Sequence, residues 1–182
     1  MKLTLVLFSI VAFLGVSNAF AQDGSVGTEH QAVITAPNAI YLEILGSGLV
    51  PSINYDRMIG NSFAVRVGVG YLPLGTVVSD SADGPISASI TTVPVGLSWF
   101  PFSGPNSAPA SKLEIGVSAF YANVVAKSFS NTAAGSGIGF GGILGYRLEP
   151  SDGGFLLRVA LTPWDLLNHF QMYGGISLGW CF

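Results

Sequence analysis

Charged side chains are scarce in this sequence. Asp, Glu, Lys and Arg make up 9% of its 182 residues, whereas about 25% is usual in a soluble domain. Hydrophobic residues reach 49% and the mean hydropathy is +0.56, so polar groups would cover a soluble surface poorly. The net charge of −3 argues against a nucleic-acid partner, because no basic stripe is available to neutralise phosphates. A membrane protein could have such a hydropathy, so the residue pattern has to decide between a soluble and a membrane protein.

Cysteine and cofactor motifs are also nearly absent. The single cysteine, Cys181, allows neither an internal disulfide nor a cysteine-based metal site. The glycine-rich stretch Gly135–Gly142, GSGIGFGG, lies within a strand pattern and opens no helix, so the dinucleotide fingerprint does not apply. The sequence predicts no cofactor and no metal ion, and it assigns no catalytic residue.

The longest apolar run is too short for a membrane-spanning helix. It covers residues 3–16, and a spanning helix needs about 20 apolar residues. Lys2 precedes the run, and Ala19-Phe20-Ala21 follows it in the small-x-small form of a signal-peptidase site. We predict a signal peptide over 1–21, a periplasmic lead-in over 22–37 and one domain over 38–182. An uncleaved anchor helix is the alternative.

Alternation of apolar with small or polar residues dominates the chain from Asn38 onward. In Phe63–Tyr71, FAVRVGVGY, the large apolar residues fall on one face, and Ala, Arg and Gly fall on the other. Such a period of two indicates strands whose two faces differ. We predict eight strands, over residues 38–46, 49–58, 63–71, 91–99, 112–121, 137–147, 155–162 and 172–182.

The connections between these strands alternate in length. The turns at 60–61 and 149–154 are short, whereas 75–86, 127–136 and 163–171 are longer and more polar. Short turns at one end and longer loops at the other are typical of outer-membrane barrels. We therefore predict an all-β fold, an eight-stranded antiparallel transmembrane up-and-down β-barrel with both termini in the periplasm.

The apolar face is predicted to point outward. Eight strands enclose a lumen only just wide enough for side chains, and the large apolar residues would overfill it. Aromatic residues lie at the strand ends, as expected for belts at the two membrane interfaces. The predicted belt at the short turns contains Tyr55, Phe63, Trp99, Tyr146, Phe155, Trp180 and Phe182, and the opposite belt contains Tyr71, Tyr121 and Trp164.

Two prolines and a glycine cluster interrupt this pattern. Pro94 falls in the middle of a strand, where it removes a ladder hydrogen bond, so we expect a β-bulge there. Pro51 also lacks a ladder hydrogen bond, but it lies near a strand start, where we expect a smaller disturbance. We expect the glycines of Gly135–Gly142 to allow tight packing in the lumen or curvature of the barrel.

The region 38–182 resembles the small eight-stranded outer-membrane β-barrel proteins of Gram-negative bacteria. The C-terminal Phe182, with Trp180, is similar to the signal that the barrel-assembly machinery reads in that family. Gly175 and Ser177 stand where the family signal has a polar residue and a glycine, so the match is partial. The resemblance implies outer-membrane location, contact with outer-membrane lipid and assembly through the C-terminal strand.

Charged residues on the inward face are expected to pair, because buried charges need partners. They are Glu43, Arg66, Glu114, Arg147 and Arg158. A paired network filling the barrel favours a non-enzymatic role in structure or surface interaction. Specificity for an extracellular ligand would then reside in the loops near 75–86, 127–136 and 163–171. A small channel is one alternative.

A lipid-modifying enzyme is the other alternative. Some barrels of the resembling class act on lipid A or phospholipids through a Ser–His arrangement, which needs a histidine beside a nucleophile. His30 lies in the lead-in, whereas His169, Asp80 and Ser81 lie in segments that could meet at the outer surface. No motif surrounds them.

Overall fold

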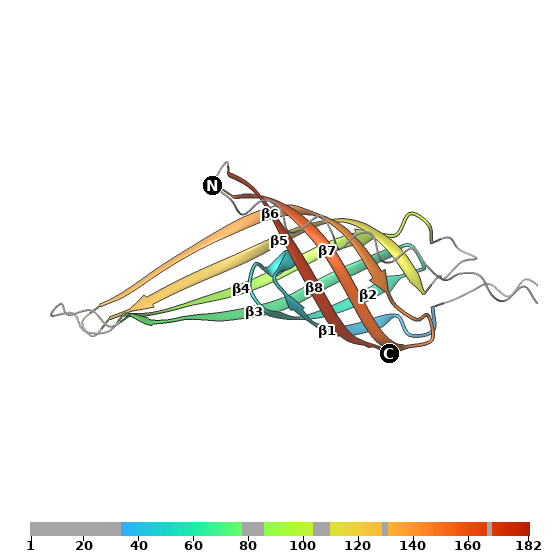
Figure 1. The fold of residues 1–182 in the computed structure, drawn as a ribbon, viewed down its shortest axis with the longest axis horizontal. Coiled ribbons are helices and arrows are strands. Elements are labelled where there is room, and N and C mark those ends of the chain that lie inside the picture. Colours follow the sequence, from blue (N-terminus) through green and yellow to red (C-terminus); the bar gives the residue numbers. More distant parts are fainter. Residues whose placement is uncertain (1–33, 78–85, 104–109, 129–130, 167–168) are drawn as a thin grey trace, which may run out of the picture.

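The protein is a closed barrel of eight strands. The computed structural model describes residues 34–77, 86–103, 110–128, 131–166 and 169–182. Its elements are β1 Asn38–Ile44, the 3₁₀ turn η2 Gly46–Gly48, β2 Ser52–Ile59, β3 Phe63–Val77, β4 Ile86–Trp99, β5 Ser111–Lys127, β6 Thr132–Leu148, β7 Gly154–Leu166 and β8 His169–Cys181. Each strand pairs antiparallel with the next, and β8 returns to β1 (Figure 1). The predicted architecture is confirmed. Within the described ranges, no helix has the length and hydropathy to cross a membrane.

The seam between β1 and β8 completes the barrel. Paired residues run from Ala39–Cys181 to Ile44–Ile176. Main-chain hydrogen bonds from Asn38 N to Phe182 O (3.1 Å) and from Phe182 N to Asn38 O (2.8 Å) join the two ends of the barrel domain. At Gly179 an added Cβ would lie 2.2 Å from the Ile40 carbonyl oxygen and 2.3 Å from the Tyr41 Cβ. The seam can close at that point only around a glycine.

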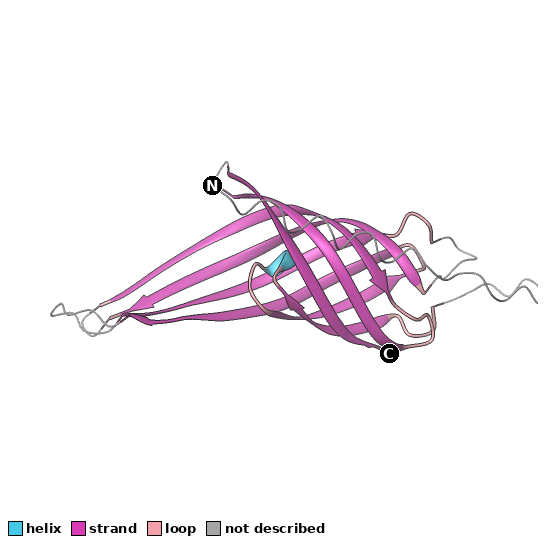
Figure 2. Ribbon diagram, viewed as in Figure 1, coloured by secondary structure: helices cyan, strands magenta, loops and turns pink. Residues whose placement is uncertain are grey.

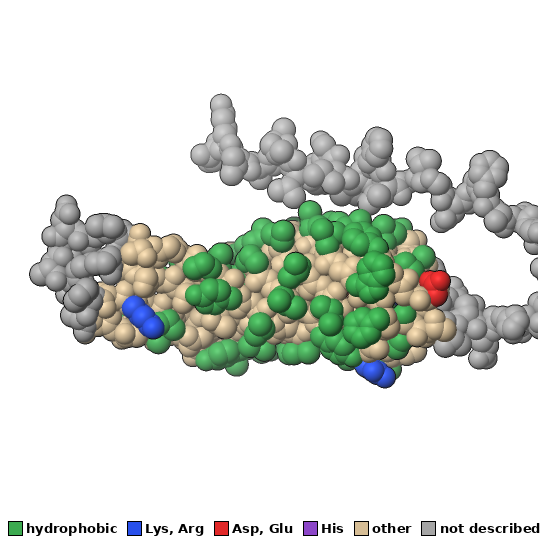
Figure 3. Space-filling view, turned by 90° about the horizontal axis from the view of Figure 1, so that it is seen from below, with side chains coloured by type: hydrophobic (Ala, Val, Ile, Leu, Met, Phe, Trp, Pro, Cys, Tyr) green, Lys and Arg blue, Asp and Glu red, His purple; other side chains and the backbone are tan. Residues whose placement is uncertain are grey.

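The outward face of the barrel is apolar, as predicted. Leu42 and Trp180 expose 60% and 61% of their surface, whereas their chain neighbours Glu43 and Cys181 are buried. Figure 3 shows hydrophobic side chains spread over the broad part of the molecule and sparser toward its narrow end. A sheet with this exterior is suited to a bilayer and not to water.

An aromatic belt surrounds the end of the barrel that carries the short turns. All seven residues predicted for this belt are exposed: Tyr55, Phe63, Trp99, Tyr146, Phe155, Trp180 and Phe182. Some of them pair directly across strands, Phe63 with Trp99 and Phe155 with Trp180. We call these seven residues the short-turn belt.

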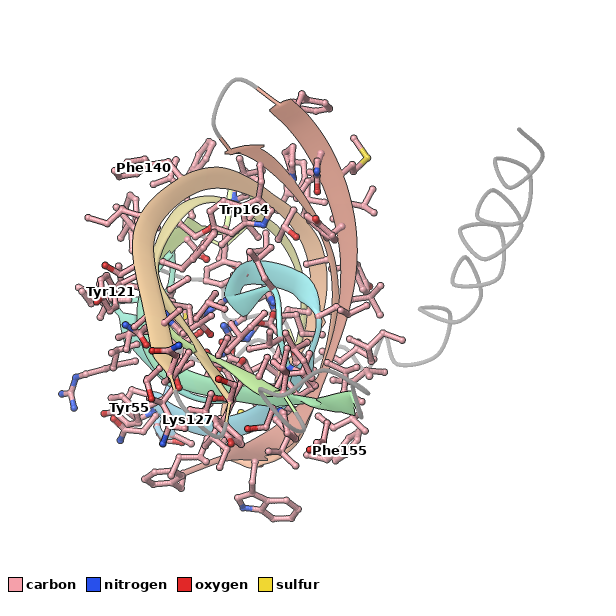
Figure 4. The ribbon with its side chains drawn as sticks, turned by 90° about the vertical axis from the view of Figure 1, so that its left-hand side faces the viewer. Tyr55, Tyr121, Lys127, Phe140, Phe155 and Trp164 are labelled. Carbon is pink, nitrogen blue, oxygen red and sulfur yellow. The ribbon has the colours of Figure 1, made fainter. Side chains whose placement is uncertain are left out.

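The opposite belt differs from the prediction at one residue. Tyr71 and Tyr121 are exposed, but Trp164 is fully buried. Strand β7 continues to Leu166, so the alternation turns Trp164 inward instead of leaving it in a loop. Seen from the narrow end in Figure 4, Trp164 lies inside the ring of strands and Phe140 lies outside it.

Strands β3 to β6 extend well beyond the rest of the barrel at one end (Figures 1 and 2). They have 15, 14, 17 and 17 residues, whereas a tilted strand needs about 9–11 to cross a bilayer. We call their outer parts, residues 71–77, 86–92, 121–127 and 132–139, the projecting sheet.

Two of the segments predicted as long loops are therefore mostly strand. Residues 132–136 belong to β6, and all of 163–171 except 167–168 belongs to β7 and β8. The hydropathy pattern missed residues 132–136 because it needs one face hidden from water, and in Thr132–Ile138 every residue is exposed. Of the third segment, 75–86, the central residues 78–85 lie outside the described ranges.

The bulge expected at Pro94 is absent. Strand β4 keeps one register with β3 on both sides of Pro94, but Val93 and Pro94 drop out of the β3–β4 ladder. The proline therefore removes ladder bonds without inserting a residue. A register shift occurs instead between Pro73 and Gly75, in the projecting sheet.

Residues 34–37 pack against the short-turn end. Ile34 joins Met58, Ala64 and Phe100 in one apolar cluster, and Ala36 joins Ala39, Tyr41, Leu156 and Cys181 in another. The predicted signal peptide and most of the predicted lead-in lie outside the described residues.

The β1–β8 seam yields a test of the architecture. We expect the Gly179→Val variant to lose the heat-modifiable band of a closed barrel on a gel in mild detergent, because the new side chain collides with β1. The control Gly174→Val, whose Cβ would meet only Leu161 Cδ2 at 3.9 Å, should retain the shift between boiled and unboiled samples. A normal shift in Gly179→Val would mean that the seam is not closed as described.

Candidate functional site

The lumen holds eight buried charged side chains, four acidic and four basic. They are Glu43, Asp56, Glu114, Glu149, Arg66, Lys112, Arg147 and Arg158. The formal charges cancel, so the layer is neutral. A buried charge without a partner is strongly destabilising, and every one of these groups has an opposite charge within 4.0 Å.

Arg158 is the centre of the upper part of this network. Its Nη1 donates to Glu43 Oε1 at 2.6 Å and its Nε to Glu114 Oε2 at 2.5 Å. Arg66 Nη2 donates to the other Glu114 oxygen at 3.1 Å, and Ser98 Oγ donates to the same atom at 2.5 Å. These contacts connect β1, β3, β4, β5 and β7 across the lumen.

Arg147 organises the lower part, nearer the short-turn end. Its Nη1 donates to Asp56 Oδ2 at 2.8 Å and its Nη2 to Glu149 Oε1 at 3.0 Å. Lys112 Nζ donates to the second Glu149 oxygen at 2.9 Å. Phe100 lies beneath both cations, with its ring centroid 5.4 Å from Lys112 Nζ and 5.8 Å from Arg147 Cζ. Charge-assisted bonds of this kind are short and directional, so they hold β2, β5 and β6 in register.

The connection between β1 and β2 folds into the lumen above the charges. All three residues of η2 are buried, and η2 contacts β3, β4, β5, β7 and β8. Ser47 Oγ donates to Glu43 Oε2 at 2.8 Å and accepts from Arg66 Nη1 at 2.9 Å. Leu45 and Leu49, on either side of the turn, have φ values of 61° and 62°, a region that costs energy for residues other than glycine. The turn, which lies within the ring of strands in Figure 2, is thus held inward by its bonds to the charge network.

An apolar layer lies on the projecting side of the lumen. The rings of Phe120 and Trp164 meet edge to face, with centroids 4.8 Å apart. An added Cβ at Gly139 would lie 2.6 Å from the Phe120 ring, and one at Gly141 would lie 2.4 Å from Trp164. Tight packing in the lumen, expected for the glycines of this stretch, is confirmed at these two positions. Trp164 Nε1 and Ser118 Oγ have no hydrogen-bond partner among the described residues.

The projecting sheet has two edges that differ in character. β2 pairs with β3 only as far as Gly70, and β7 pairs with β6 only from Phe140. The β3 edge carries Pro73, the register shift and Gly75 with φ 88°, features that blunt an edge against further pairing. The β6 edge, Thr132–Gly139, has neither a proline nor a charged residue.

The five inward charges predicted from the sequence all lie in the network. The prediction missed Asp56, Lys112 and Glu149. Asp56 and Lys112 share the inward parity of their strands, which is the signal that could have identified them. Glu149 was assigned to a turn, and its position just after β6 becomes informative only once Arg147 is seen beside it.

The residues of the predicted enzymatic alternative are not brought together in the described part of the chain. His30, Asp80 and Ser81 lie outside the described residues, and His169 is the first residue of β8. A Ser–His arrangement therefore stays a prediction.

Comparison with known proteins supports the fold. No protein-family model matches the sequence, and no curated protein does so. The N-terminal β-barrel domain of Pseudomonas aeruginosa OprF matches with a TM-score of 0.50 and 9% identity, over 80% of this chain and 95% of that domain. Ail, the attachment invasion locus protein of Yersinia pestis, matches with a TM-score of 0.44 and 13% identity, over 79% of this chain and 91% of Ail.

A closed eight-stranded sheet, an apolar exterior and an aromatic belt define the class of this protein. Together with the likeness to the OprF barrel, they show that the chain has the fold of the small eight-stranded outer-membrane β-barrels.

The charge network makes a prediction about stability. Replacing Arg158 with Met removes the nearest cation from the buried carboxylates of Glu43 and Glu114, and we expect the free energy of unfolding to fall by about 3–5 kcal/mol, measured by urea titration in detergent micelles. Arg57, which lies on the exposed face of β2, provides the control, and Arg57→Met should leave the unfolding midpoint nearly unchanged. Equal midpoints for both variants would contradict the role given to Arg158.

The filled lumen makes a prediction about conductance. Because η2 and the neutral charge layer occupy the cross-section, we expect no single-channel steps in planar bilayers containing the refolded protein. A general porin inserted under the same conditions serves as the positive control. Reproducible steps from the purified barrel would revive the channel alternative.

Proposed function

We propose that this protein is a surface-interaction barrel that binds macromolecules through its projecting sheet. The observation that carries the proposal is the excess length of β3 to β6 over what a bilayer requires. The outer parts of these four strands extend past the membrane and are not needed to span it. They present a β-sheet surface to partners outside the membrane.

The low charge of the projecting sheet favours contact with a partner, because little electrostatic repulsion opposes it. Lys127 is the only charged residue among its described positions, and Ser, Thr, Ala and Gly predominate. The lumen is filled by paired charges, which leaves the exterior and the projection as the surfaces available for binding.

The β6 edge suggests how a partner is bound. An unpaired edge offers main-chain N–H and C=O groups, and an extended peptide can add to it as a further strand. Residues 132–137 of this edge have small, exposed side chains that leave the backbone accessible, and Gly135 and Gly137 have no atom within 4 Å of an added Cβ. We therefore infer that the partner contributes an extended segment to this edge.

Trimming the projection tests the proposed function. In the trimmed variant, tight turns join Tyr71 to Thr91 and Tyr121 to Ile138, which are paired residues, and the barrel below them is unchanged. Cells displaying the whole protein should adhere to surfaces coated with serum proteins, matrix proteins or polysaccharides, and cells displaying the trimmed variant should not. Equal adherence, or none above cells lacking the protein, would contradict the proposal.

A second comparison tests the edge. Lysine on an edge strand disfavours further pairing, so Gly135→Lys combined with Gly137→Lys should abolish the adherence of the whole protein. Thr76→Lys, on the already blunted β3 edge, is the matched control and should have little effect. Both variants should retain the gel shift of a closed barrel. Loss of adherence in the control alone would place the contact elsewhere on the projection.

A further inference from the structure

A shallow apolar groove crosses the outer wall of the barrel. It has a volume of about 800 Å³ and runs from β4 across β5 and β6 to β7 and β8. Its lining includes Phe140 and Phe170, which expose 66% and 71% of their surface, and the smaller residues Ala119, Gly142 and Pro163. A volume of this size lies within the range of about 300–1,000 Å³ found for small-molecule sites.

The groove exists because small residues adjoin at one height of the wall. Gly142 of β6 pairs with Val117 of β5. The next outward residue of β5, Ala119, pairs with Phe140 of β6. The ring of Pro163 leans toward Gly142, since an added Cβ there would lie 3.2 Å from Pro163 Cγ. Other outward positions of these strands carry valine, leucine or phenylalanine. Because Gly142, Ala119 and Pro163 are smaller, they leave a depression in the wall.

The β6–β7 ladder also has fewer hydrogen bonds beside the groove. The ladder between β6 and β7 pairs Gly141 with Trp164 and then resumes at Leu144 and Leu161. The residues between, including Gly142 and Pro163, do not pair, because proline has no N–H to donate. Trp164 lies directly behind this seam and is one of the residues that line the groove.

The groove lies within the membrane-facing surface. On β5 its residues lie just below Tyr121, and on β6 they lie above Tyr146 of the short-turn belt. It is thus continuous with the outward apolar face, on the half of the bilayer nearer the projecting sheet. The medium in contact with it is the acyl-chain region of that leaflet.

We propose that this groove is a binding site for an acyl chain of a membrane lipid. A chain lying in it contacts apolar side chains on both sides and covers the seam at Pro163, which an ordinary neighbouring lipid on a convex wall does not do. A second copy of the barrel fits less well. Two-fold association sets a patch against itself, and two concave grooves facing each other would leave a void between them.

Trp164 provides the reporter for a test. The chain has three tryptophans, so Trp99→Phe with Trp180→Phe leaves Trp164 as the only one. This protein is reconstituted into dioleoylphosphatidylcholine vesicles and into vesicles of the same lipid brominated at the middle of its chains. Bromine quenches indole fluorescence at short range, and we expect Trp164 to lose fluorescence in the brominated vesicles.

Filling the groove separates bound lipid from lipid that merely surrounds the barrel. Ala119→Leu and Gly142→Leu, each added to the single-tryptophan protein, should displace the chain and restore most of the lost Trp164 fluorescence. The matched control Val159→Leu adds bulk to an outward position of β7 that does not line the groove, and it should quench like the parent. All variants are first checked for the gel shift of a closed barrel, and two filling variants guard against one failing to fold.

Two outcomes would overturn the proposal. One is quenching that is absent, or equal in the filled and control variants, because the chain would then not enter the groove. The other is quenching that appears only when the protein is diluted in a large excess of lipid. That result would mean that a second copy covers the groove at higher density.

Discussion

The lack of water in the bilayer core is the constraint on which the rest of this structure depends. An unpaired backbone N–H or C=O costs several kcal/mol there, so the sheet has to close, and β8 pairs with β1 along a seam that tolerates only glycine at position 179. Closing eight strands leaves a lumen that side chains alone can fill. The choice of inward side chains then decides whether the barrel is a pore or a sealed cylinder.

The lumen of this barrel is filled by paired charges. A buried ion pair contributes little net stability over an apolar pair of the same shape, but losing one partner is costly. The network therefore serves mainly to fix the register of the strands. Arg158 and Arg147 contact their carboxylates only when the strands that carry these side chains are correctly aligned. The inward turn η2 uses the same groups, through Ser47, and completes the filling.

The exterior falls into two parts with different solvents. Over the broad part, large apolar residues face the bilayer, interrupted by the groove at Gly142 and Pro163. Beyond Tyr71 and Tyr121 the strands continue past the membrane-facing wall, where Ser, Thr, Ala and Gly predominate and every residue of Thr132–Ile138 is exposed. One set of strands thus offers a lipid-facing wall and a projecting surface, and the two proposed sites lie on these two parts.

The sequence by itself determined the fold class, the strand count, the outward face and the five inward charges, because a membrane-facing sheet with a filled lumen imposes a strict period of two on residues such as Phe63–Tyr71. It did not reveal the projecting sheet, since that periodicity vanishes where both faces of Thr132–Ile138 meet water. Only the tertiary structure decided that Trp164 turns inward, that Pro94 interrupts a ladder without a bulge, and that Asp56, Lys112 and Glu149 complete the charge network. The parity of their strands already points Asp56 and Lys112 inward, but their partners lie on strands that are distant in the chain, and no local pattern carries that information.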